Sequence, residues 1–455
     1  MEPLSEPAPS AAEAPLERLS GWGRHPIGLG RVSRSERIVL PPGSAPVLPR
    51  GLGRSYGDAA VPGSRETLVI DVTRADRIIE FDAGTGLLTC EAGVSLAEII
   101  RVFLPRGWFP AVTPGTKFVT VAGCVACDVH GKNHHRDGTF GRFVERLTLQ
   151  AADGRQVVCG PSIERELFLA TVGGMGLTGL ITEVALRLRP VESAWIALET
   201  RNARGLDEML ELLRASAADW PYTVGWIDSL APGSALGRGV MMRGRHASRE
   251  EVAGRRVPPP RAIRVPVDAP AWLLNRYSVQ LFNRIYHWRH GAPARRLVSY
   301  EEFFYPLDAV LDWNRLYGRR GFLQYQCVLP RAAGVRPVRA VLERIAASGA
   351  ASFLAVIKDC GPGWEAYLSF PQEGTTLALD FPYRGPATEA LVHELNALVI
   401  EAGGRVYLAK DAVTRPEHWA SMMPRLGEWR AVRARWDPAR RFRSAQSVRL
   451  LGDPA

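Results

Sequence analysis

Short apolar runs, broken by glycine, proline and aspartate, characterise the first part of the chain. Their period and length predict strands at 38–40, 68–72, 78–81, 87–92, 144–151, 155–158 and 180–188. Helical spacing occurs at 95–104, where Ser95 can cap the first turn, and again at 166–172. Because helices and strands do not alternate regularly, the pattern predicts an α+β domain and not a series of βαβ units.

The pattern changes after Pro190. It predicts further strands and helices, the strands at 192–200, 222–227, 321–329, 352–358 and 376–381 and the helices at 206–217, 335–347, 388–402 and 423–437. Residues 250–300 fit neither element type, because two arginines and three prolines are followed by aromatic residues mixed with arginines. We predict a mobile loop there, and a disordered tail over the proline- and alanine-rich residues 1–19.

Composition narrows the classes of function. Of the 455 residues, 46% are hydrophobic and 23% are charged, which is ordinary for a globular protein and excludes wholesale disorder or a fibrous repeat. The 57 basic and 47 acidic residues give a net charge of +10, which favours anionic partners such as phosphate groups, lipid headgroups or nucleic acid. No nucleic acid is expected, because the arginines are dispersed and no recognition motif occurs. The six scattered cysteines do not indicate a disulfide framework.

Lysine is rare in this chain. Only four of the 57 basic residues are lysine: Lys117, Lys132, Lys358 and Lys410. Where arginine is used almost everywhere, a remaining lysine can mark a position that needs a compact ammonium group in place of a planar guanidinium. The four lysines are therefore candidates for functional positions.

A glycine-rich segment follows the apolar run 45–48. Its residues are Arg50, Gly51, Leu52, Gly53, Arg54, Ser55, Tyr56, Gly57 and Asp58. Three glycines within seven residues let successive backbone N–H groups converge on an anion, and Arg50 and Arg54 can add charge-assisted bonds to a diphosphate. A glycine-rich surface turn is the alternative interpretation.

Residues 174–179 form a G-x-G-x-x-G sequence. We reject a nicotinamide site of the Rossmann type, because a helix is predicted before this turn and a strand after it, which reverses the Rossmann order. A close-packed turn against a cofactor or a neighbouring backbone is the expected role.

The segment 113–135 carries the most candidate chemistry. Its small residues allow the backbone to approach a flat ligand closely, and the polar residues His130 and Lys132 follow. Cys124 and Cys127 form a C-x-x-C sequence, for which a zinc or dithiol site is the weaker hypothesis, because no second ligand pair has a suitable spacing. We predict no metal.

Together these motifs resemble the FAD-linked oxidases of the vanillyl-alcohol-oxidase type, and within them the enzymes that oxidise a polyprenyl-phosphoryl ribose. The matching segments run from about residue 45 to the C-terminus and are 50–58, 114–116, 126–135, 170–179, 321–326, 352–358, 379–382 and 407–411. The resemblance implies a two-domain PCMH-type fold. An FAD-binding domain at 20–192 would be followed by an inserted substrate (cap) domain at 193–410, and residues 411–455 would return to the first domain.

The resemblance also implies a site for FAD. The glycine-rich loop would bind its diphosphate. Further positions matching flavin contacts are Pro114, Gly115, Thr116, Thr120, Val121, Ala122, Gly123, Cys127, Asp128, Val129, His130, Ile181 and Tyr407. Many relatives of this fold bind FAD covalently through a histidine in the first loop. Tyr56 stands at that position here, so we predict non-covalent FAD.

The implied reaction is hydride transfer from a sugar C2–H to flavin N5 with loss of the hydroxyl proton, the first half of an epimerisation to an arabinose donor. Lys410 is the first implied catalytic residue, followed by His130 and Lys132. The implied substrate-binding residues are Lys358, Gln326, Trp226, Thr376, Ala378, Phe304 and Cys360. Four of these depart from the family pattern, which has cysteine at 378, asparagine at 376, phenylalanine at 360 and tyrosine at 304. The departures put the exact sugar in doubt.

The expected partners follow from this reaction. They are a lipid-linked sugar phosphate as substrate and a separate NAD(P)H-dependent keto-reductase. Residues 250–300 are expected either to make peripheral contact with a membrane or to form an ordinary surface loop. A flavin oxidase of a free sugar or alditol that uses oxygen is the alternative function. With no signal peptide or membrane span in the sequence, the expected location is the cytoplasm or the periphery of the inner membrane, and the periplasm requires a partner.

Overall fold

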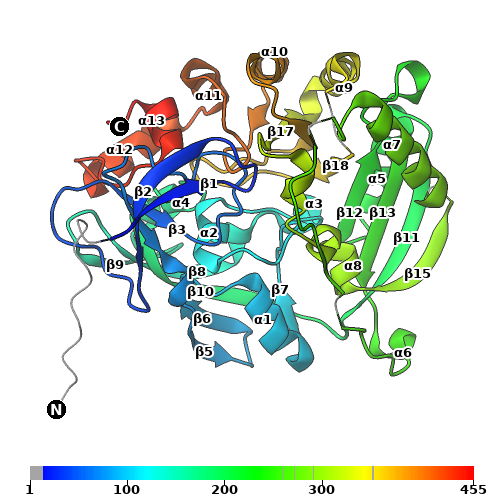
Figure 1. Cartoon of the computed structure of the whole chain (residues 1–455). Coiled ribbons are helices and arrows are strands. Elements are labelled where there is room, and N and C mark those ends of the chain that lie inside the picture. Colours follow the sequence, from blue (N-terminus) through cyan, green and yellow to red (C-terminus); the bar gives the residue numbers. More distant parts are fainter. Residues whose placement is uncertain (1–13, 260, 271, 291, 351–352) are drawn as a thin grey trace.

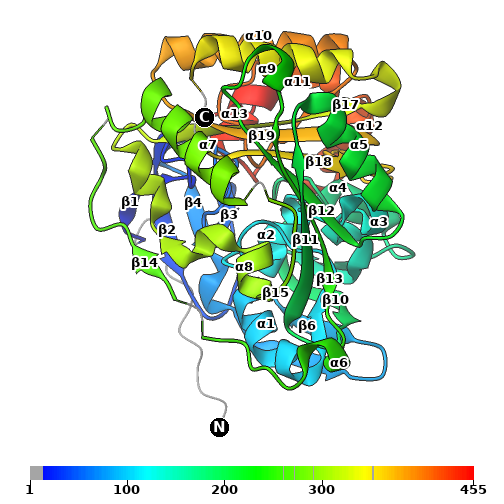
Figure 2. The same cartoon turned by 90° about the vertical axis from the view of Figure 1, so that its right-hand side faces the viewer.

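The computed structural model describes residues 14–259, 261–270, 272–290, 292–350 and 353–455 (Figures 1 and 2). In the first lobe, which comprises 14–190 and 416–455, one sheet has the order β1-β2-β4-β3 and another has the order β5-β6-β10-β8-β9, with β7 paired to β10. The bounds of these strands are β1 (Leu16–Ser20), β2 (Ile27–Arg34), β3 (Val47–Arg50), β4 (Leu68–Asp71), β5 (Ile78–Asp82), β6 (Leu87–Glu91), β7 (Trp108–Pro110), β8 (Val144–Gln150), β9 (Gln156–Cys159) and β10 (Leu180–Pro190).

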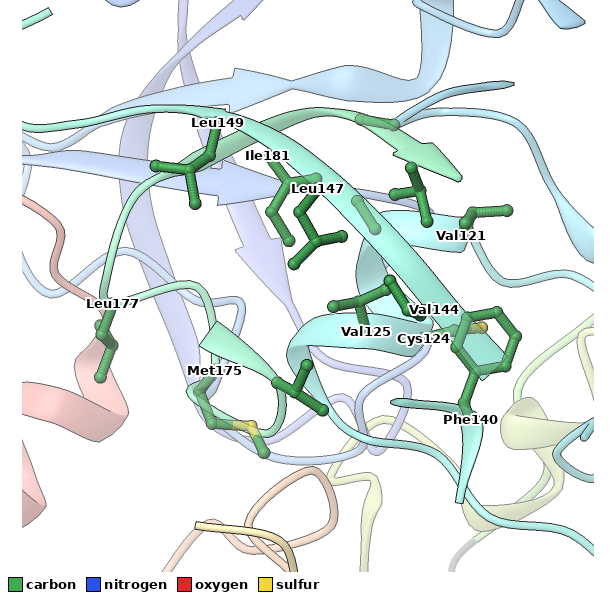
Figure 3. Close-up of a cluster of buried hydrophobic side chains, with 14 of the residues drawn as sticks. Val121, Cys124, Val125, Phe140, Val144, Leu147, Leu149, Met175, Leu177 and Ile181 are labelled. Atoms are coloured by element: carbon green, nitrogen blue, oxygen red, sulfur yellow. The ribbon is translucent and has the colours of Figure 1, made fainter. Parts of the chain in front are cut away.

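The helices α1 (Leu96–Phe103), α2 (Val121–Ala126) and α4 (Arg165–Thr171) pack with these sheets, whereas α3 (His134–Asp137) contacts a strand of the second lobe. The predicted cap of α1 is confirmed, because the Ser95 hydroxyl accepts a hydrogen bond from the Glu98 N–H at 3.1 Å. Figure 3 shows part of the core, where Val121 and Val125 of α2 lie against Leu147 of β8. This packing fixes the small-residue segment before His130.

The second lobe, residues 195–406, is built on a sheet of order β15-β11-β13-β12-β18-β19-β17-β20. Its strands are β11 (Trp195–Ala203), β12 (Tyr222–Ile227), β13 (Gly239–His246), β15 (Ala294–Ser299), β17 (Phe322–Pro330), β18 (Ala355–Cys360), β19 (Gly374–Pro382) and β20 (Arg405–Val406). The helices α5 (Leu206–Ala217), α9 (Arg336–Ser348) and α10 (Pro386–Glu401) share a hydrophobic core with it. Side chains alternate across the strands, so Leu323, Tyr325 and Cys327 of β17 face that core while Gln324 and Gln326 face a cavity on the other side.

The C-terminal helices return to the first lobe. They are α11 (Pro416–Met422), α12 (Leu426–Trp436) and α13 (Ala445–Leu451). Val47 of β3 pairs in parallel with Phe442, and the Trp429 indole N–H donates to the Ala170 carbonyl at 3.0 Å. The last part of the chain therefore completes the lobe that its beginning starts (Figure 1).

Three sequence predictions need correction. Residues 38–40 form no strand, because the Leu40 N–H donates to the Gln150 side chain at 2.7 Å and not to a sheet. The predicted tail ends before Leu16, since β1 pairs antiparallel with β2, and residues 1–13 lie outside the described part. The segment 250–300 is not one loop, because it contains α6 (Arg249–Val252), β14 (Ile263–Arg264), α7 (Arg276–His290) and β15.

Two further elements follow this segment, α8 (Tyr300–Phe304) and β16 (Val310–Leu311), the latter parallel to β14. Among the described residues, no helix has the length and apolar character needed to cross a bilayer.

Candidate active site

A cavity of about 750 Å³ has walls from both lobes. Its size lies within the range of small-molecule and cofactor sites. The first lobe contributes 49–56, residues from 113–132 and the turn before β10, and the second lobe contributes one face of its sheet together with α7 and α8. This arrangement brings the two groups of predicted residues, cofactor and substrate, to one space.

The glycine-rich loop forms part of the cavity wall directly after β3. Gly53 has a φ of +64°, in the left-handed region that favours glycine. A Cβ on Gly57 would collide with the Asp411 carbonyl, so only glycine permits the close approach of these two backbones. The backbone N–H groups of 52–55 donate to no protein acceptor within the described residues. They form the kind of convergent donor set that binds phosphate oxygens.

The two arginines of this loop have different roles. Arg50 donates to the Ser20 carbonyl at 2.8 Å and to the Ala60 carbonyl, so its guanidinium ties the loop to its flanks. Arg50 also lines the cavity, so a contact of its remaining N–H groups with a diphosphate stays a prediction. The Arg54 guanidinium lies 4.0 Å from the centre of the Trp22 ring and lines the cavity as well. Arg54 donates to no carbonyl of the described residues and is therefore the less constrained of the two.

Most of the other residues predicted to contact FAD also line the cavity. They are Gly51, Leu52, Gly53, Ser55, Tyr56, Pro114, Gly115, Thr116, Thr120, Ala122, Gly123, Cys127, Val129, His130, Ile181 and Tyr407. Val121 belongs to the core instead. The Asp128 carboxylate is buried and accepts hydrogen bonds from the Gly141 N–H, the Trp364 indole and the Ser369 hydroxyl at 3.0, 2.9 and 2.5 Å. It therefore joins three segments beneath the cavity.

Asp58 does not line the cavity either. Its carboxylate is buried and accepts hydrogen bonds from Arg449 of α13 at 2.8 and 2.9 Å. The same guanidinium donates to Asp411 at 2.8 Å. Arg449 thus joins the loop to the segment after Lys410, a connection the sequence analysis did not find.

The G-x-G-x-x-G turn and the C-x-x-C sequence also meet at the cavity. Met175 and Gly176 have φ angles of +54° and +77° and line it, as does Cys127, whose carbonyl accepts from the Tyr407 hydroxyl at 2.8 Å. Cys124 has no exposed surface and belongs to the core, and it lines the cavity together with Cys127. Burial raises the pKa of both thiols, which disfavours the thiolate form.

A hydrogen-bond chain fixes the state of His130. The Thr376 hydroxyl donates to the Cys327 carbonyl at 2.9 Å and accepts from the Gln326 amide at 3.3 Å. The same amide nitrogen of Gln326 lies 2.8 Å from Nε2 of His130 and donates to it. Burial and the nearby Lys358 charge hold the pKa of His130 well below its usual value. His130 is therefore neutral, with its proton on Nδ1.

Three of the four lysines line the cavity: Lys132, Lys358 and Lys410. Burial, together with the nearby Lys358 charge, lowers the pKa of both Lys132 and Lys410 to about 7. Lys132 donates to the Phe304 carbonyl at 3.2 Å. The Lys410 ammonium lies 3.6 Å from the centre of the Tyr56 ring. The fourth lysine, Lys117, instead forms an ion pair with Glu301.

Asp380 is a buried acid that the sequence analysis missed. It lies on β19 behind Gln324, whose amide donates to it at 2.6 Å, and the Tyr317 hydroxyl donates at 3.0 Å. Burial raises the pKa of Asp380 to about 7, while the charge of Lys410 opposes that rise. In turn the Asp380 carboxylate raises the pKa of Lys410, so the two groups are electrostatic partners.

The substrate-side predictions divide into two groups. Trp226, Phe304, Gln326, Lys358 and Ala378 line the cavity, whereas Thr376 and Cys360 do not. Thr376 has no exposed surface and reaches the cavity only through Gln326. Cys360 is likewise fully buried at the end of β18.

The sequence analysis also missed the five lining residues within 250–300, which are Arg264, Tyr286, His290, Arg296 and Val298. The Tyr286 ring lies 4.4 Å from that of Trp226 and 4.5 Å from that of His290. Tyr286 and His290 lie one helical turn apart on α7, but exposed apolar residues on the opposite face of this helix hide that spacing in the sequence.

The residues present fit FAD. The free N–H donors of 52–55 and Arg54 suit a diphosphate, and the small residues of α2 leave room for a flat ring system beside Tyr407. The cavity continues from these segments to the face of the second lobe that carries the lysines. A redox cofactor and an organic substrate therefore have adjoining places.

Comparison with known proteins agrees with this fit. A family model described as an FAD binding domain matches residues 43–160. The chain is 37% identical to decaprenylphosphoryl-β-D-ribose oxidase of Mycolicibacterium smegmatis over 453 residues, covering 95% of this chain and 97% of that protein. It is 35% identical to an uncharacterised Streptomyces coelicolor protein, covering 78% of this chain and all of that protein. It is 30% identical to rice cytokinin dehydrogenase 7 over 45% of this chain and 40% of that protein.

The matched ranges include the cavity-lining residues of both lobes. The family model covers the glycine-rich loop and α2, and the M. smegmatis alignment extends across the lysine-bearing sheet as well. The chain is therefore an FAD-dependent oxidoreductase and belongs to the family of FAD-linked oxidases that includes decaprenylphosphoryl-β-D-ribose oxidase.

Proposed function

We propose that this protein oxidises the 2′-hydroxyl of a polyprenyl-phosphoryl ribose to the 2′-keto sugar. The observation that carries the proposal is the convergence of Lys132, Lys358 and Lys410 on one cavity with the FAD-binding loops. Cationic walls favour an anionic substrate such as a sugar phosphate. The M. smegmatis relative, which aligns over nearly the whole chain, is named for a substrate of this class.

In this proposal Lys410 accepts the hydroxyl proton. A pKa of about 7 leaves a large neutral fraction near neutrality, which suits a general base. FAD held by the loop 50–57 would supply the hydride acceptor for C2. The Lys410 ammonium donates to no acceptor among the described residues, whereas the Lys132 ammonium donates to the Phe304 carbonyl. Loss of the proton to Lys410 and of the hydride from C2 leaves the carbonyl of the keto sugar.

His130 and Gln326 position the sugar in this proposal. The Gln326 amide holds the neutral His130 ring in one orientation, and both residues line the cavity beside Lys358. A neutral histidine adds no positive charge to a site that already contains three lysines. The binding charges are thus Lys358 and the protonated form of Lys132, and Ala378 leaves more room than the family cysteine would.

The proposal is tested by mixing the FAD-loaded protein, without oxygen, with a short-chain polyprenyl-phosphoryl ribose. We expect the long-wavelength flavin absorbance to bleach and a 2′-keto sugar phosphate to form. Free ribose and alditols serve as comparison substrates and should bleach it far more slowly. Bleaching by a free sugar or alditol but not by the phosphoryl ribose would instead identify an oxidase of free sugars.

The flavin is expected to be non-covalent. Tyr56 occupies the loop position at which many relatives have a histidine, and its backbone N–H donates to the Ala409 carbonyl at 2.9 Å. Burial also raises the pKa of its phenol, which disfavours an attacking phenolate. Acid precipitation should therefore release all flavin into the supernatant. Flavin that remains with the precipitate after washing would contradict this prediction.

The pH dependence of flavin reduction should follow Lys410. Because the neutral amine is the active form, the rate is expected to rise as the pH increases through about 7. In the D380N variant the charge that raises the pKa of Lys410 is absent, so the rising limb should move to lower pH. Stopped-flow measurement of flavin reduction across a pH series gives the rising limb of the unaltered protein and that of D380N. A limb that moves to higher pH, or a rate that falls with rising pH, would contradict the assignment.

A keto product needs a further enzyme to complete an epimerisation. We propose an NAD(P)H-dependent keto-reductase as the partner that returns the carbonyl to a hydroxyl of opposite configuration. A lipid-linked substrate also sets the place of the reaction at a membrane surface.

A further inference from the structure

Helix α7 has two unlike faces. On its inner face Val279 and Asn283 are buried, and the Asn283 amide donates to Asp228 at 2.7 Å. Tyr286 and His290 of the same face line the cavity. This face holds the helix against the second lobe, beside the cavity.

The outer face exposes large apolar side chains. Tyr277, Leu281, Ile285 and Trp288 are 80%, 60%, 53% and 83% exposed and recur every three or four residues, so they form one stripe along the helix. We call these four residues the exposed stripe. Trp272 precedes it and is 73% exposed. Single exposed apolar residues are common, but a continuous stripe on a soluble surface indicates an interaction site.

The charge around the stripe is of one sign. Residues 269–300 contain no aspartate or glutamate. They contain five arginines, at 276, 284, 289, 295 and 296. Arg276, Arg284 and Arg289 lie on α7 itself and are exposed. An apolar stripe with aromatic residues and flanking arginines is the composition of a helix that lies in the interface of an anionic bilayer.

We propose that the outer face of α7 docks this protein on an anionic lipid bilayer. Two copies of the chain joined through this face would bring like-charged arginines together, which disfavours a symmetric dimer. An anionic lipid surface instead neutralises the arginines while tryptophan and tyrosine enter the headgroup region.

The position of α7 connects docking on the membrane with entry of the substrate. This connection rests on the proposed function. The same helix that faces the bilayer contributes Tyr286 and His290 to the cavity wall. A sugar held by a membrane-embedded polyprenyl tail could thus enter the cavity while the tail stays in the lipid. Docking would shorten the path between the lipid and the lysines.

The test is co-sedimentation of the full-length, FAD-loaded protein with vesicles. Vesicles of phosphatidylcholine alone are compared with vesicles that also contain phosphatidylglycerol, at low and high salt. We expect binding to the anionic vesicles that weakens with salt. The variant R284Q/R289Q should bind them about 30-fold more weakly, at about 1 kcal/mol for each arginine. The matched control R65Q/R430Q, which removes two exposed arginines elsewhere, should bind as the unaltered protein does.

The stripe itself is tested with Y277S/L281S/I285S/W288S. Its control is I79S/I163S, which removes apolar side chains that are 50% and 54% exposed on the first lobe. We expect only the stripe variant to lose vesicle binding. No binding of the unaltered protein to anionic vesicles, equal loss in both variants, or a stripe-dependent dimer without vesicle binding would each overturn the proposal.

A second measurement separates this proposal from the proposed function. Flavin reduction by a short-chain, freely dissolved phosphoryl ribose should be the same in the stripe variant and the unaltered protein. Vesicle binding without any such reduction would support the docking surface and contradict the proposed substrate. Flavin reduction without vesicle binding would support the proposed substrate and contradict the docking surface.

Discussion

Replacing Lys410 with methionine is expected to lower the rate constant of flavin reduction by about 10²–10⁴-fold, the usual contribution of a positioned base. The ammonium of Lys410 lies 3.6 Å from the centre of the Tyr56 ring and lines the cavity. Methionine keeps most of the side-chain volume but accepts no proton. Single-turnover stopped-flow measurement of the oxidised flavin absorbance gives the rate constant without contribution from later steps.

Two further variants distinguish a base from a fixed charge. Arginine at 410 keeps the positive charge and cannot accept a proton near neutrality, so K410R should be as slow as K410M. Added small primary amines should partly restore reduction in K410A, because the truncated side chain leaves room for them. If K410R reduces its flavin at nearly the original rate, Lys410 supplies charge and is not the base. Unchanged flavin content in all three variants would show that the site is intact.

Replacing Arg449 with methionine is expected to lower the free energy of unfolding by about 3–5 kcal/mol, because two buried carboxylates lose their cation. Arg449 donates to Asp58 at 2.8 and 2.9 Å and to Asp411 at 2.8 Å. Asp58 and Asp411 are only 2% and 8% exposed, so water would hydrate the two carboxylates poorly in place of the guanidinium. Urea denaturation of the FAD-loaded protein, followed by tryptophan fluorescence, measures the loss.

The matched control is R344M. Arg344 pairs with Glu394 on the surface, with 39% and 51% of the two side chains exposed, so its loss should cost about 1 kcal/mol or less. R449M should also bind FAD more weakly, because Asp58 and Asp411 join the glycine-rich loop to the segment of Lys410. Equal stability of R449M and R344M would contradict the assigned role of this buried ion pair.

Much of the fold could be predicted because local patterns agree with the final packing. The helix and strand expected at 206–217 and 222–227 match α5 and β12 at both ends, since each has a clear apolar period. The segment 276–290 was missed for the opposite reason. Its helix places apolar residues on both faces, so the period that normally separates core from solvent is absent.

The site was predicted in part. The glycine-rich loop and three of the lysines were identified from residue type and resemblance, and they line the cavity. The pairing of Asp58 with Arg449 spans 391 positions along the chain, and no local pattern indicates such a contact. Thr376 and Asp380 share the cavity-facing side of β19 with Ala378, but Gln326 and Gln324 cover them. Alternation predicts which side of the sheet a side chain faces, but it does not predict which residue of the neighbouring strand covers that side chain.

The closure of the first lobe by the end of the chain has a consequence for synthesis. Val47 of β3 pairs with Phe442, and Asp58 meets Arg449, so the loop after β3 lacks its supports until these late residues leave the ribosome. The cofactor loop is thus finished only after residues 442–449 are made, although its own sequence is made early. Loading of FAD is expected to wait for these late residues, and a product truncated before α13 should remain colourless.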